Sequence, residues 1–425
     1  MPRSPGRRRP LLAVVHDVGS ASPLMVLSAA RRICDVVFVC DLRQERVAAS
    51  IATADGHARI LDIGGRTSQG ALGAIASAAP DGVVTFSEYQ LDLTSRIATA
   101  LGLPFHGRAT AAVLTDKLAQ RRALARAAVD ATPCALVHGD GAAALAAVGL
   151  PAVIKPRRGA GSADTIRVDT HEDFRAAVAA LPRDRAFVAE RLLAGDPAVA
   201  GRSCGDYVSV ESVTTPAGGS RQVCVTGKFP LAPPFRETGM FLPSTLSERA
   251  ESAVLALERA ALRALGVRHG VTHTEIKLTA DGPRVIEVNG RLGGYVPEIL
   301  RRATGVDLVA IALQVALGRE PAVAAPTFRD VTYQLFVTPP ADAGTLVALD
   351  GLEAAAALPH VRRVDLRARP GQPLDWRHGT EGHLGVVYGS APDHATLWAA
   401  VDAVATALRP TYGAAGGTPA AVGAR

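Results

Sequence analysis

The sequence predicts a multidomain chain of mixed α/β and α+β class, and three observations lead to this fold class. Residues 11–108 alternate short apolar runs with Ala-rich helical stretches, which is typical of an open α/β layer. Beyond it, a Gly-rich loop joins two apolar segments at 153–168, and a hairpin of alternating polar and apolar residues follows at 273–294. A Pro- and Ala-rich stretch, 318–330, then precedes a last α+β segment.

Four apolar runs in the first layer are expected to form parallel strands: LLAVV at 11–15, DVVFVC at 35–40, ARILDI at 58–63 and GVVTF at 82–86. Helical stretches such as SPLMVLSAARRI, at 22–33, lie between them. The loop after the first run, HDVGSASP, lacks the GxGxxG pattern, so a dinucleotide oxidoreductase has little support.

Composition excludes several classes of function. The net charge is +6, but four of those charges are arginines in the first nine residues, so the rest of the chain is close to neutral. With only 4% aromatic residues, nucleic-acid binding is not expected. No apolar run is long enough to span a membrane, and the short run after the arginines does not fit a signal peptide. Five cysteines without CxxC spacing indicate a reducing, cytoplasmic location.

Lysine and asparagine are unusually rare in this chain. Only four of the 46 basic residues are lysines, namely Lys117, Lys155, Lys228 and Lys277, and Asn289 is the single asparagine. A bias that replaces lysine wherever arginine suffices would leave lysine where a compact ammonium is needed. The four lysines are therefore candidates for functional positions.

The hairpin at 273–294, HTEIKLTADGPRVIEVNGRLGG, places two carboxylates on neighbouring strands. With a turn near Asp281, Glu275 and Glu287 face each other, and period two puts Asn289 on the face of Glu287. Like charges opposite each other are destabilising, so a cation such as Mg²⁺ is one explanation. An exposed hairpin with two solvated acids is the other, and the hairpin alone does not decide between them. Zinc shared by His269 and His273 has weak support.

The glycine loop at 159–162 follows Lys155 and is suited to phosphate. Small residues there let backbone N–H groups approach phosphate oxygens, and Lys155 adds a point charge. A Walker A pattern is absent, and an ordinary Gly-rich hairpin loop is the alternative. Lys117 lies in a helix expected over 114–129.

Taken in order, Lys117, Lys155, the strand end FVAE at Glu190 and the acidic hairpin resemble the ATP-grasp superfamily. Within it, the chain is similar to the bacterial L-amino-acid ligases in DYVSVE, FRETGMFLPSTL, HTEIKL and IEVNGRLGG, and in the later YQLFVTPPADAGTL and PHVRRVDLRARPGQPL. The resemblance implies an ATP-grasp fold with these parts: a basic disordered start, 1–10; a Rossmann-like pre-ATP-grasp domain, 11–108; an ATP-grasp domain, 109–325, with its lid at about 130–192; a C-terminal α+β domain, 326–412; and a disordered tail, 413–425.

The resemblance also implies roles at the nucleotide. Residues expected to hold the ATP phosphates are Lys117, Lys155, Gly159, Gly161 and Ser162. Glu190, with the backbone of Arg191 and Leu192, would lie at the adenine edge, and the inserted stretch 194–205 leaves the ribose contact open. Glu275, Glu287 and Asn289 would bind Mg²⁺, with Mn²⁺ as the alternative.

At the substrates, Arg291 suits a carboxylate that becomes an acyl phosphate. Glu211 and His273 are the two candidates for binding or deprotonating the amine, and the sequence does not choose between them. Residues expected to line the amino-acid pocket are Phe235, Glu237, Gly293, Gly294 and Tyr295, although Tyr295 could equally be a structural tyrosine.

The predicted activity is ATP-dependent amide formation between two amino acids, through an acyl phosphate with release of ADP and phosphate, in specialised metabolism. Alternatives are an ATP-grasp enzyme that uses another carboxylate or carboxylates its substrate, and a non-catalytic nucleotide-binding protein. The expected partners are small molecules, and a homodimer is a common state in the family.

Overall fold

The structure is a computed structural model that describes residues 8–201, 203–414 and 419–420. Its N-terminal layer is a parallel sheet of order β3-β2-β1-β4, as the apolar runs predict. The strands are β1 (Leu11–Val15), β2 (Asp35–Cys40), β3 (Arg59–Asp62) and β4 (Gly82–Val84). Its helices are α1 (Pro23–Ala30), α2 (Glu45–Ile51), η1 (Ala52–Ala54), α3 (Ser68–Ser77), η2 (Glu88–Gln90) and α4 (Leu91–Leu101).

Part of the predicted disordered start is ordered against this layer. Arg8 pairs with Asp81 at 3.0 Å, and Arg9 pairs with Asp35 at 2.9 Å. Residues 1–7 lie outside the described part of the chain.

The helix expected over 114–129 is α6 (Lys117–Arg126), and a separate short helix, α5 (Arg108–Leu114), ends just before it. The break arises because the Asp116 side chain accepts a hydrogen bond from the Ala119 N–H and so caps a new helix. Lys117 consequently stands in the first turn of α6 and not inside a longer helix.

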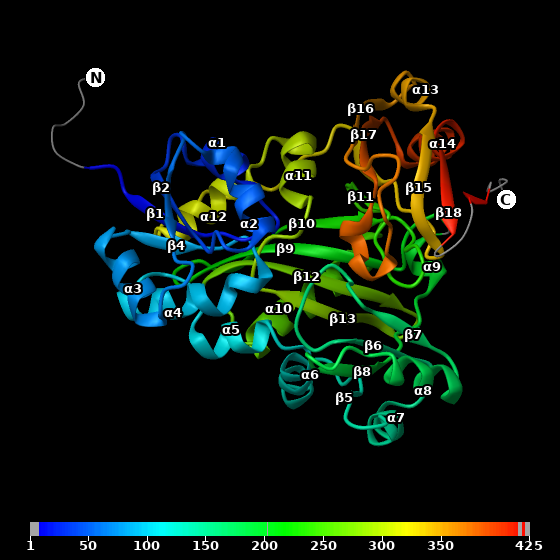
Figure 1. Cartoon of the computed structure of the whole chain (residues 1–425), viewed down its shortest axis with the longest axis horizontal. Coiled ribbons are helices and arrows are strands. Elements are labelled where there is room, and N and C mark those ends of the chain that lie inside the picture. The colour runs from blue at the N-terminus through cyan, green and yellow to red at the C-terminus, as the bar shows by residue number, and fades with distance from the viewer. Residues whose placement is uncertain (1–7, 202, 415–418, 421–425) are drawn as a thin grey trace.

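A small sheet of order β5-β8-β6-β7 follows, and we call residues 134–191 the lid. Its elements are β5 (Cys134–Leu136), α7 (Ala142–Val148), β6 (Ala152–Pro156), β7 (Ile166–Val168), α8 (His171–Ala179) and β8 (Phe187–Arg191). Helix α8 begins with a reciprocal capping box between Thr170 and Asp173, which fixes its start. Figure 1 shows the lid at the lower right, across from the central sheet.

The central sheet has eight strands in the order β13-β12-β9-β10-β11-β14-β17-β16. They are β9 (Tyr207–Thr215), β10 (Gly219–Lys228), β11 (Gly239–Leu242), β12 (Gly270–Thr279), β13 (Gly282–Asn289), β14 (Val331–Phe336), β16 (Val361–Leu366) and β17 (Gly385–Ala391). The last three belong to the segment expected to be a separate C-terminal domain. They continue the same sheet through the antiparallel pairing of β11 with β14.

Helices and a small second sheet complete the chain. They are α9 (Pro197–Ala200), α10 (Glu248–Ala264), α11 (Val296–Thr304), α12 (Leu308–Ala316), α13 (Leu352–Ala356), η3 (Trp376–Gly382) and α14 (His394–Ala407), with the sheet β15 (Ala343–Asp350), β18 (Arg409–Ala414) and β19 (Pro419–Ala420). The predicted disordered tail, 413–425, is therefore wrong at 413–414 and 419–420, which form strand. Its other residues lie outside the described part.

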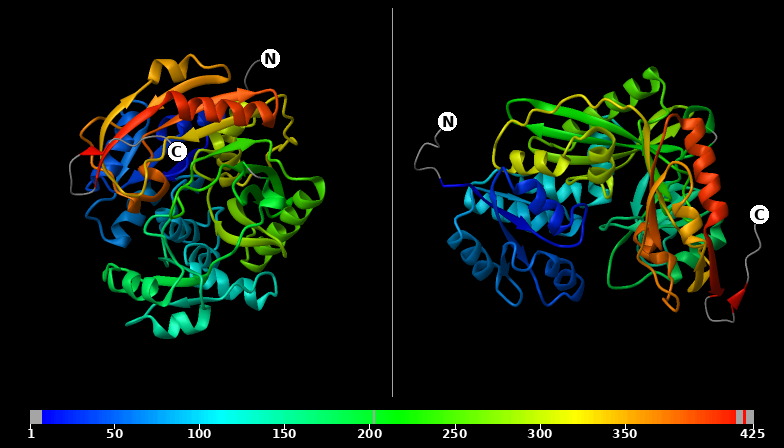
Figure 2. Two further views of the ribbon diagram at one scale, coloured as in Figure 1. Left: turned by 90° about the vertical axis from the view of Figure 1, so that its right-hand side faces the viewer. Right: turned by 90° about the horizontal axis from the view of Figure 1, so that it is seen from above.

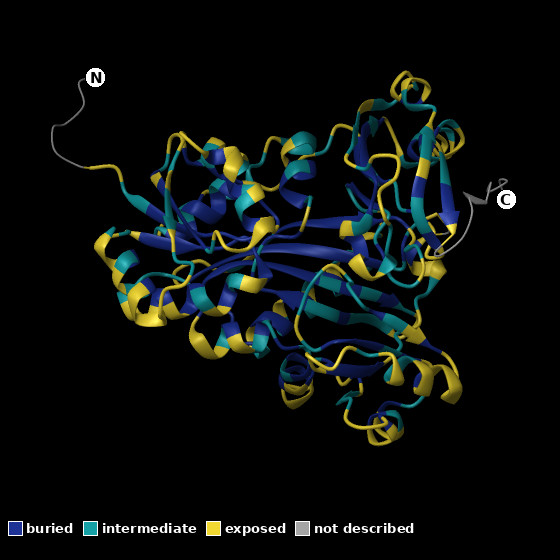
Figure 3. Ribbon diagram, in the orientation of Figure 1, coloured by how far each residue is buried: buried dark blue, intermediate teal, exposed yellow. Residues whose placement is uncertain are grey.

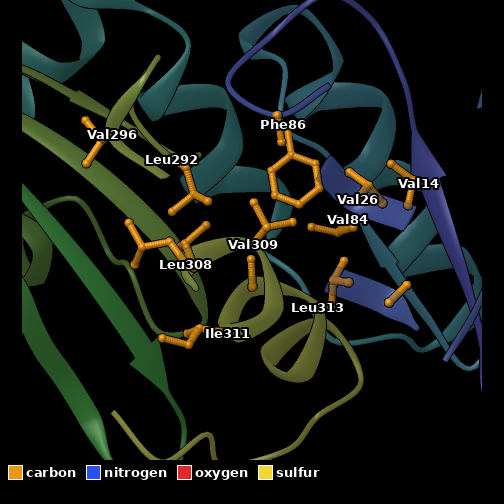
Figure 4. Packing of buried hydrophobic residues seen from close by; sticks show 14 of the residues in the cluster. Val14, Val26, Val84, Phe86, Leu292, Val296, Leu308, Val309, Ile311 and Leu313 are labelled. Atoms are coloured by element: carbon orange, nitrogen blue, oxygen red, sulfur yellow. The ribbon is translucent and has the colours of Figure 1, made fainter. Parts of the chain in front are cut away.

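One apolar core joins the N-terminal layer to the central sheet. Figure 4 shows Phe86 beside Val309 of α12, and Leu292 beside Leu308. Leu292 is fully buried and follows Arg291, so it anchors the loop that carries that arginine. The N-terminal layer and the C-terminal part lie at opposite ends of the molecule (Figure 2).

The central strands β9, β10 and β12 are largely buried, and exposed residues gather on the outer helices (Figure 3). No helix in the described residues is long and apolar enough to cross a membrane. All five cysteines are free thiols.

Candidate active site

Two rows of polar side chains cross three adjacent strands of the central sheet. Direct register pairs join β9 to β12 and β12 to β13. The rows, in the order β9, β12, β13, are Glu211–His273–Asn289 and Ser209–Glu275–Glu287. Glu275 and Glu287 are thus directly opposite each other, as the hairpin predicts, and the whole patch lies on one face.

His273 links the two rows. Its Nδ1 is hydrogen-bonded to Glu211, which is fully buried, and its Nε2 lies 3.4 Å from Oε1 of Glu275. Burial alone would lower the pKa of His273, but the two carboxylates outweigh it and raise the pKa to about 9. A protonated His273 cannot accept a proton, so this arrangement argues against His273 as the base.

The two facing carboxylates are compensated by cations. Lys117 Nζ lies 3.1 Å from Glu287 Oε1. Burial would raise the pKa of Glu275, but His273, Lys228 and Arg291 lower it to about 2. Glu275 is thus held ionised, as a metal ligand must be.

Mg²⁺ fits this donor set. Glu275, Glu287 and the Asn289 amide oxygen supply hard oxygen donors on one face, and Mg²⁺ is usually held by one or two carboxylates plus phosphates. Within the described residues, no group of three or more His, Cys, Asp or Glu side chains forms a self-sufficient metal site. The donors present therefore suit a metal that also takes ligands from a phosphate substrate.

The two lysines expected at the phosphates come from different elements, Lys117 from α6 and Lys155 from β6. Lys117 Nζ donates to the Gly159 carbonyl at 2.7 Å, which ties α6 to the glycine loop. Lys155 Nζ lies 2.8 Å from Glu190 Oε2. Arg121 is 3.0 Å from the same oxygen.

Glu190 is a buried carboxylate that forms ion pairs with both Arg121 and Lys155. Burial would raise its pKa, but Arg121 and Lys155 lower the pKa to about 2. The backbone N–H groups of Arg191 and Leu192 donate to the Pro133 and Pro151 carbonyls, both at 3.0 Å. These two N–H groups are already used, so only their carbonyl oxygens are left to accept from an adenine amino group.

The glycine loop between β6 and β7 adopts a left-handed backbone. The φ angles are 131° at Gly159, 69° at Gly161 and 57° at Ser162. The loop is held from the C-terminal part: the Thr380 N–H donates to the Gly161 carbonyl at 2.9 Å, and the Asp164 N–H donates to the Arg377 carbonyl at 3.1 Å. The lid loop is therefore fastened to η3 by backbone hydrogen bonds.

Arg291 lies just past the end of β13 and has a partner that the sequence did not indicate. Its Nη2 donates to Asn289 Oδ1 at 3.2 Å, and its Nε is 3.2 Å from Glu88 Oε2. Glu88 is 8% exposed, and neither of its oxygens has a hydrogen-bond partner among the described residues. Burial, only partly offset by Arg291, raises the pKa of Glu88 to about 7.

The loop after Arg291 is shaped by close contacts. The Gly293 N–H donates to Glu211 at 3.1 Å, and a Cβ at Gly293 would meet His273 Nδ1 at 2.4 Å. Gly294 has open space around it. Tyr295 is half-buried with a φ of 64°, and its hydroxyl is 2.7 Å from His383 Nε2. Tyr295 thus packs partly against the apolar core, and His383 occupies its hydroxyl.

Of the other predicted pocket residues, Glu237 pairs with the fully buried Lys228 at 2.9 Å, and Phe235 is half-buried two residues earlier. Lys277 pairs with Asp206 at 2.6 Å. All four lysines of the chain thus make short ion pairs.

A cavity of about 930 Å³ lies away from this chemistry. It is lined by the turn of the hairpin, Thr279–Pro283, together with α9, the start of α10 and Trp398. It shares no residue with the two polar rows, so we do not assign the reaction to it.

Comparison with known proteins identifies the domains. A profile of the ATP-grasp domain matches residues 148–297, and one of the L-amino acid ligase C-terminal domain 2 matches residues 335–413. The L-amino acid ligase of Bacillus licheniformis superposes with a TM-score of 0.75 at 23% identity, covering 96% of this chain and 100% of that one.

Two curated relatives align over shorter regions. Protein y4rH of Sinorhizobium fredii is 30% identical over 330 residues, which are 74% of this chain and 65% of that protein. The alanine–anticapsin ligase of Bacillus subtilis is 28% identical over 255 residues, 55% of this chain and 53% of that enzyme. The chain therefore spans less than two thirds of either relative.

Proposed function

Because the chain belongs to the ATP-grasp superfamily, with an ATP-grasp domain and an L-amino acid ligase C-terminal domain, we propose that it is an ADP-forming ligase that joins two amino acids. The observation that carries the proposal is the Glu88–Arg291–Asn289 cluster beside the acidic hairpin. It offers a cation for a carboxylate and, next to it, a buried carboxylate for an ammonium group.

At the nucleotide, we assign the phosphates to Lys117, Lys155 and the backbone of the loop Gly159–Ser162. The left-handed loop conformation favours N–H groups that converge on an anion. Glu275, Glu287 and Asn289 would hold Mg²⁺, which neutralises phosphate charge when bound. ATP would thus be held between the lid and the central sheet.

At the acid substrate, Arg291 binds the carboxylate and keeps it in line for attack on the γ-phosphorus of ATP, which yields an acyl phosphate and ADP. Glu88 binds the ammonium group of the same substrate, which would supply hydrogen bonds to the two carboxylate oxygens that have none. The second substrate then attacks the acyl carbonyl as a free amine, the C–O bond to phosphate breaks, and the proton from the nitrogen leaves with the phosphate.

Glu211 and His273 act as positioning residues in this proposal. Glu211 accepts from the Gly293 N–H and from His273, so the pair fixes the loop between Arg291 and Tyr295. The hydrogen bonds that close η3 over the lid loop would help to exclude water from the acyl phosphate. The free thiols of all five cysteines fit a reducing compartment, and we assign the enzyme to the cytoplasm.

Glu88 also helps to decide which class of acid the enzyme uses as its substrate. A carboxylating enzyme, or a ligase for a simple carboxylic acid, has no ammonium group to satisfy this buried acid, whereas an amino acid does. The ligase of two amino acids is therefore favoured over both alternatives.

The test is ATP turnover with Mg²⁺ and pooled amino acids, with ADP, AMP and phosphate quantified and new masses read by mass spectrometry. Glu287→Ala should abolish turnover. Asp281→Ala, an exposed acid at the turn of the same hairpin, should leave it unchanged. ADP, phosphate and a new amide mass are expected, whereas AMP with pyrophosphate would refute the acyl-phosphate mechanism.

A further inference from the structure

The C-terminal part of the chain surrounds Tyr295. Its ring centroid lies 4.7 Å from that of Phe336 and 5.6 Å from that of His383, whose Nε2 meets the tyrosine hydroxyl. Gln334 of β14 donates to the Tyr295 carbonyl at 3.3 Å. Tyr295 follows the loop of Arg291 in sequence, but these three contacting residues lie more than 35 positions later.

Two open charges of opposite sign flank this ring. The Arg367 guanidinium lies 6.0 Å from the ring centroid. Glu381, in η3, is exposed. Partial burial of its carboxyl group raises the pKa, whereas the positive charge of Arg367 lowers it. In the described residues, neither side chain forms an ion pair. Both charges are therefore free to bind a ligand that lies on Tyr295.

The position of η3 connects these charges to the active site. The Glu237 N–H donates to Thr380 Oγ1 at 3.1 Å, and the Thr380 N–H holds the lid loop at Gly161. Glu381 directly follows Thr380 in η3, and Glu237 and Arg291 are among the charges that shift the pKa of its carboxyl. A ligand between Glu381 and Arg367 would adjoin the acid substrate on Arg291.

Resting on the ligase activity proposed above, we propose that Arg367 and Glu381 form the subsite for the amino acid that supplies the amine. Arg367 binds its carboxylate and Glu381 its ammonium, with the Tyr295 ring, fixed by His383, beneath the ligand. The acid substrate already occupies Arg291 and Glu88, so the second zwitterion needs a second pair of opposite charges. The substrate class that follows is a free α-amino acid, not its amide or a simple amine.

The test compares two amine donors, a free amino acid and the same amino acid with its α-carboxylate converted to a carboxamide. Fragmentation of the product in the mass spectrometer first establishes which of its two residues supplied the amine. Wild-type enzyme should prefer the free amino acid by on the order of 10- to 100-fold in KM, the range expected for a charge-assisted hydrogen bond. Arg367→Gln should raise the KM of the amino acid by that factor and abolish the preference, with the KM of ATP and of the acid unchanged. Glu381→Gln should raise the KM of both amines. Arg369→Gln, an exposed arginine of the same segment, is the matched control.

Each outcome decides between the proposals. If the ligase turns over and Arg367→Gln keeps the wild-type preference, the amine subsite is refuted while the proposed function stands. If no product forms, thermal shifts with a non-hydrolysable ATP analogue, Mg²⁺ and single amino acids replace turnover. If an amino acid raises the melting temperature of wild type and of Arg369→Gln but not of Arg367→Gln, the subsite is supported even without ligase activity. Equal increases in all three proteins refute the subsite.

Discussion

The buried pair of Glu211 and His273 should make the free energy of unfolding depend on pH. The folded-state pKa of His273 is about 9 against an ordinary value of 6.5. A raised histidine pKa stabilises the folded state fully below the unfolded pKa, and the contribution is lost as pH rises through the folded pKa. The shift corresponds to about 3 kcal/mol in total, of which about 2 kcal/mol should disappear between pH 7 and pH 9.5.

Urea denaturation of wild type and His273→Gln across this pH range measures the effect. The fluorescence of Trp376 and Trp398 and the circular dichroism signal must first give coincident transitions, because a chain of 425 residues need not unfold in one step. His273→Gln should be less stable at pH 7, because Glu211 stays buried without its cation. Its stability should fall by about 2 kcal/mol less than that of wild type between pH 7 and pH 9.5.

His269→Gln is the matched control, because burial lowers the pKa of His269 and this histidine therefore does not titrate between pH 7 and pH 9.5. This variant should lose stability with rising pH as wild type does. Parallel curves for wild type and His273→Gln would refute the argument, because they would mean that His273 is neutral at pH 7.

Three further substitutions test the loops around the site. Gly293→Ala should destabilise the fold by about 1–3 kcal/mol and reduce turnover, because the new Cβ would meet His273; thermal melting and turnover measure this. Tyr295→Ala should change which amino acids are joined and leave nucleotide affinity unchanged, and an identical product profile would contradict the assignment. Gly379→Ala should raise phosphate release per amide formed, because its Cβ would lie 2.0 Å from the Gly161 carbonyl oxygen and would separate η3 from the lid loop. If this variant still releases one phosphate per amide, η3 does not keep water away from the acyl phosphate.

Two nearby glycines supply the controls. A Cβ at Gly294 meets nothing within 4 Å, so Gly294→Ala should leave stability near wild type. Gly371→Ala shares the left-handed backbone of Gly379, with a φ of 85°, but meets nothing within 4 Å. It should therefore cost a similar backbone strain without uncoupling turnover.

The strands and the hairpin could be predicted from sequence because period-two patterns and turn residues are local signals. The facing of Glu275 and Glu287 follows from the same pattern and is present in the structure. The helix start expected at Leu114 is wrong because Asp116 caps the helix that begins at Lys117, and an Asp before a helical run is itself a start signal.

Residues brought together by tertiary packing could not be found in this way. Glu88 reaches Arg291 only because the N-terminal layer packs on α12, about 200 residues later. A polar residue just after a parallel strand was the one available signal, since ligands bind at the carboxyl ends of such strands. Arg367 and Glu381 carry no comparable pattern, and their relation to Tyr295 depends on the return of the chain through β16 and β17.

The continuity of the central sheet limits how this protein could be rebuilt from separately expressed parts. Four register pairs join β11 to β14, from Gly239–Leu335 to Leu242–Thr332, so a chain truncated in the linker at 318–330 would leave β11 as a bare edge. Such a fragment is expected to aggregate and not to fold as an autonomous nucleotide-binding unit. Chimaeras that seek new substrate choice should therefore exchange short loops such as η3, and keep β11 and β14 from one parent.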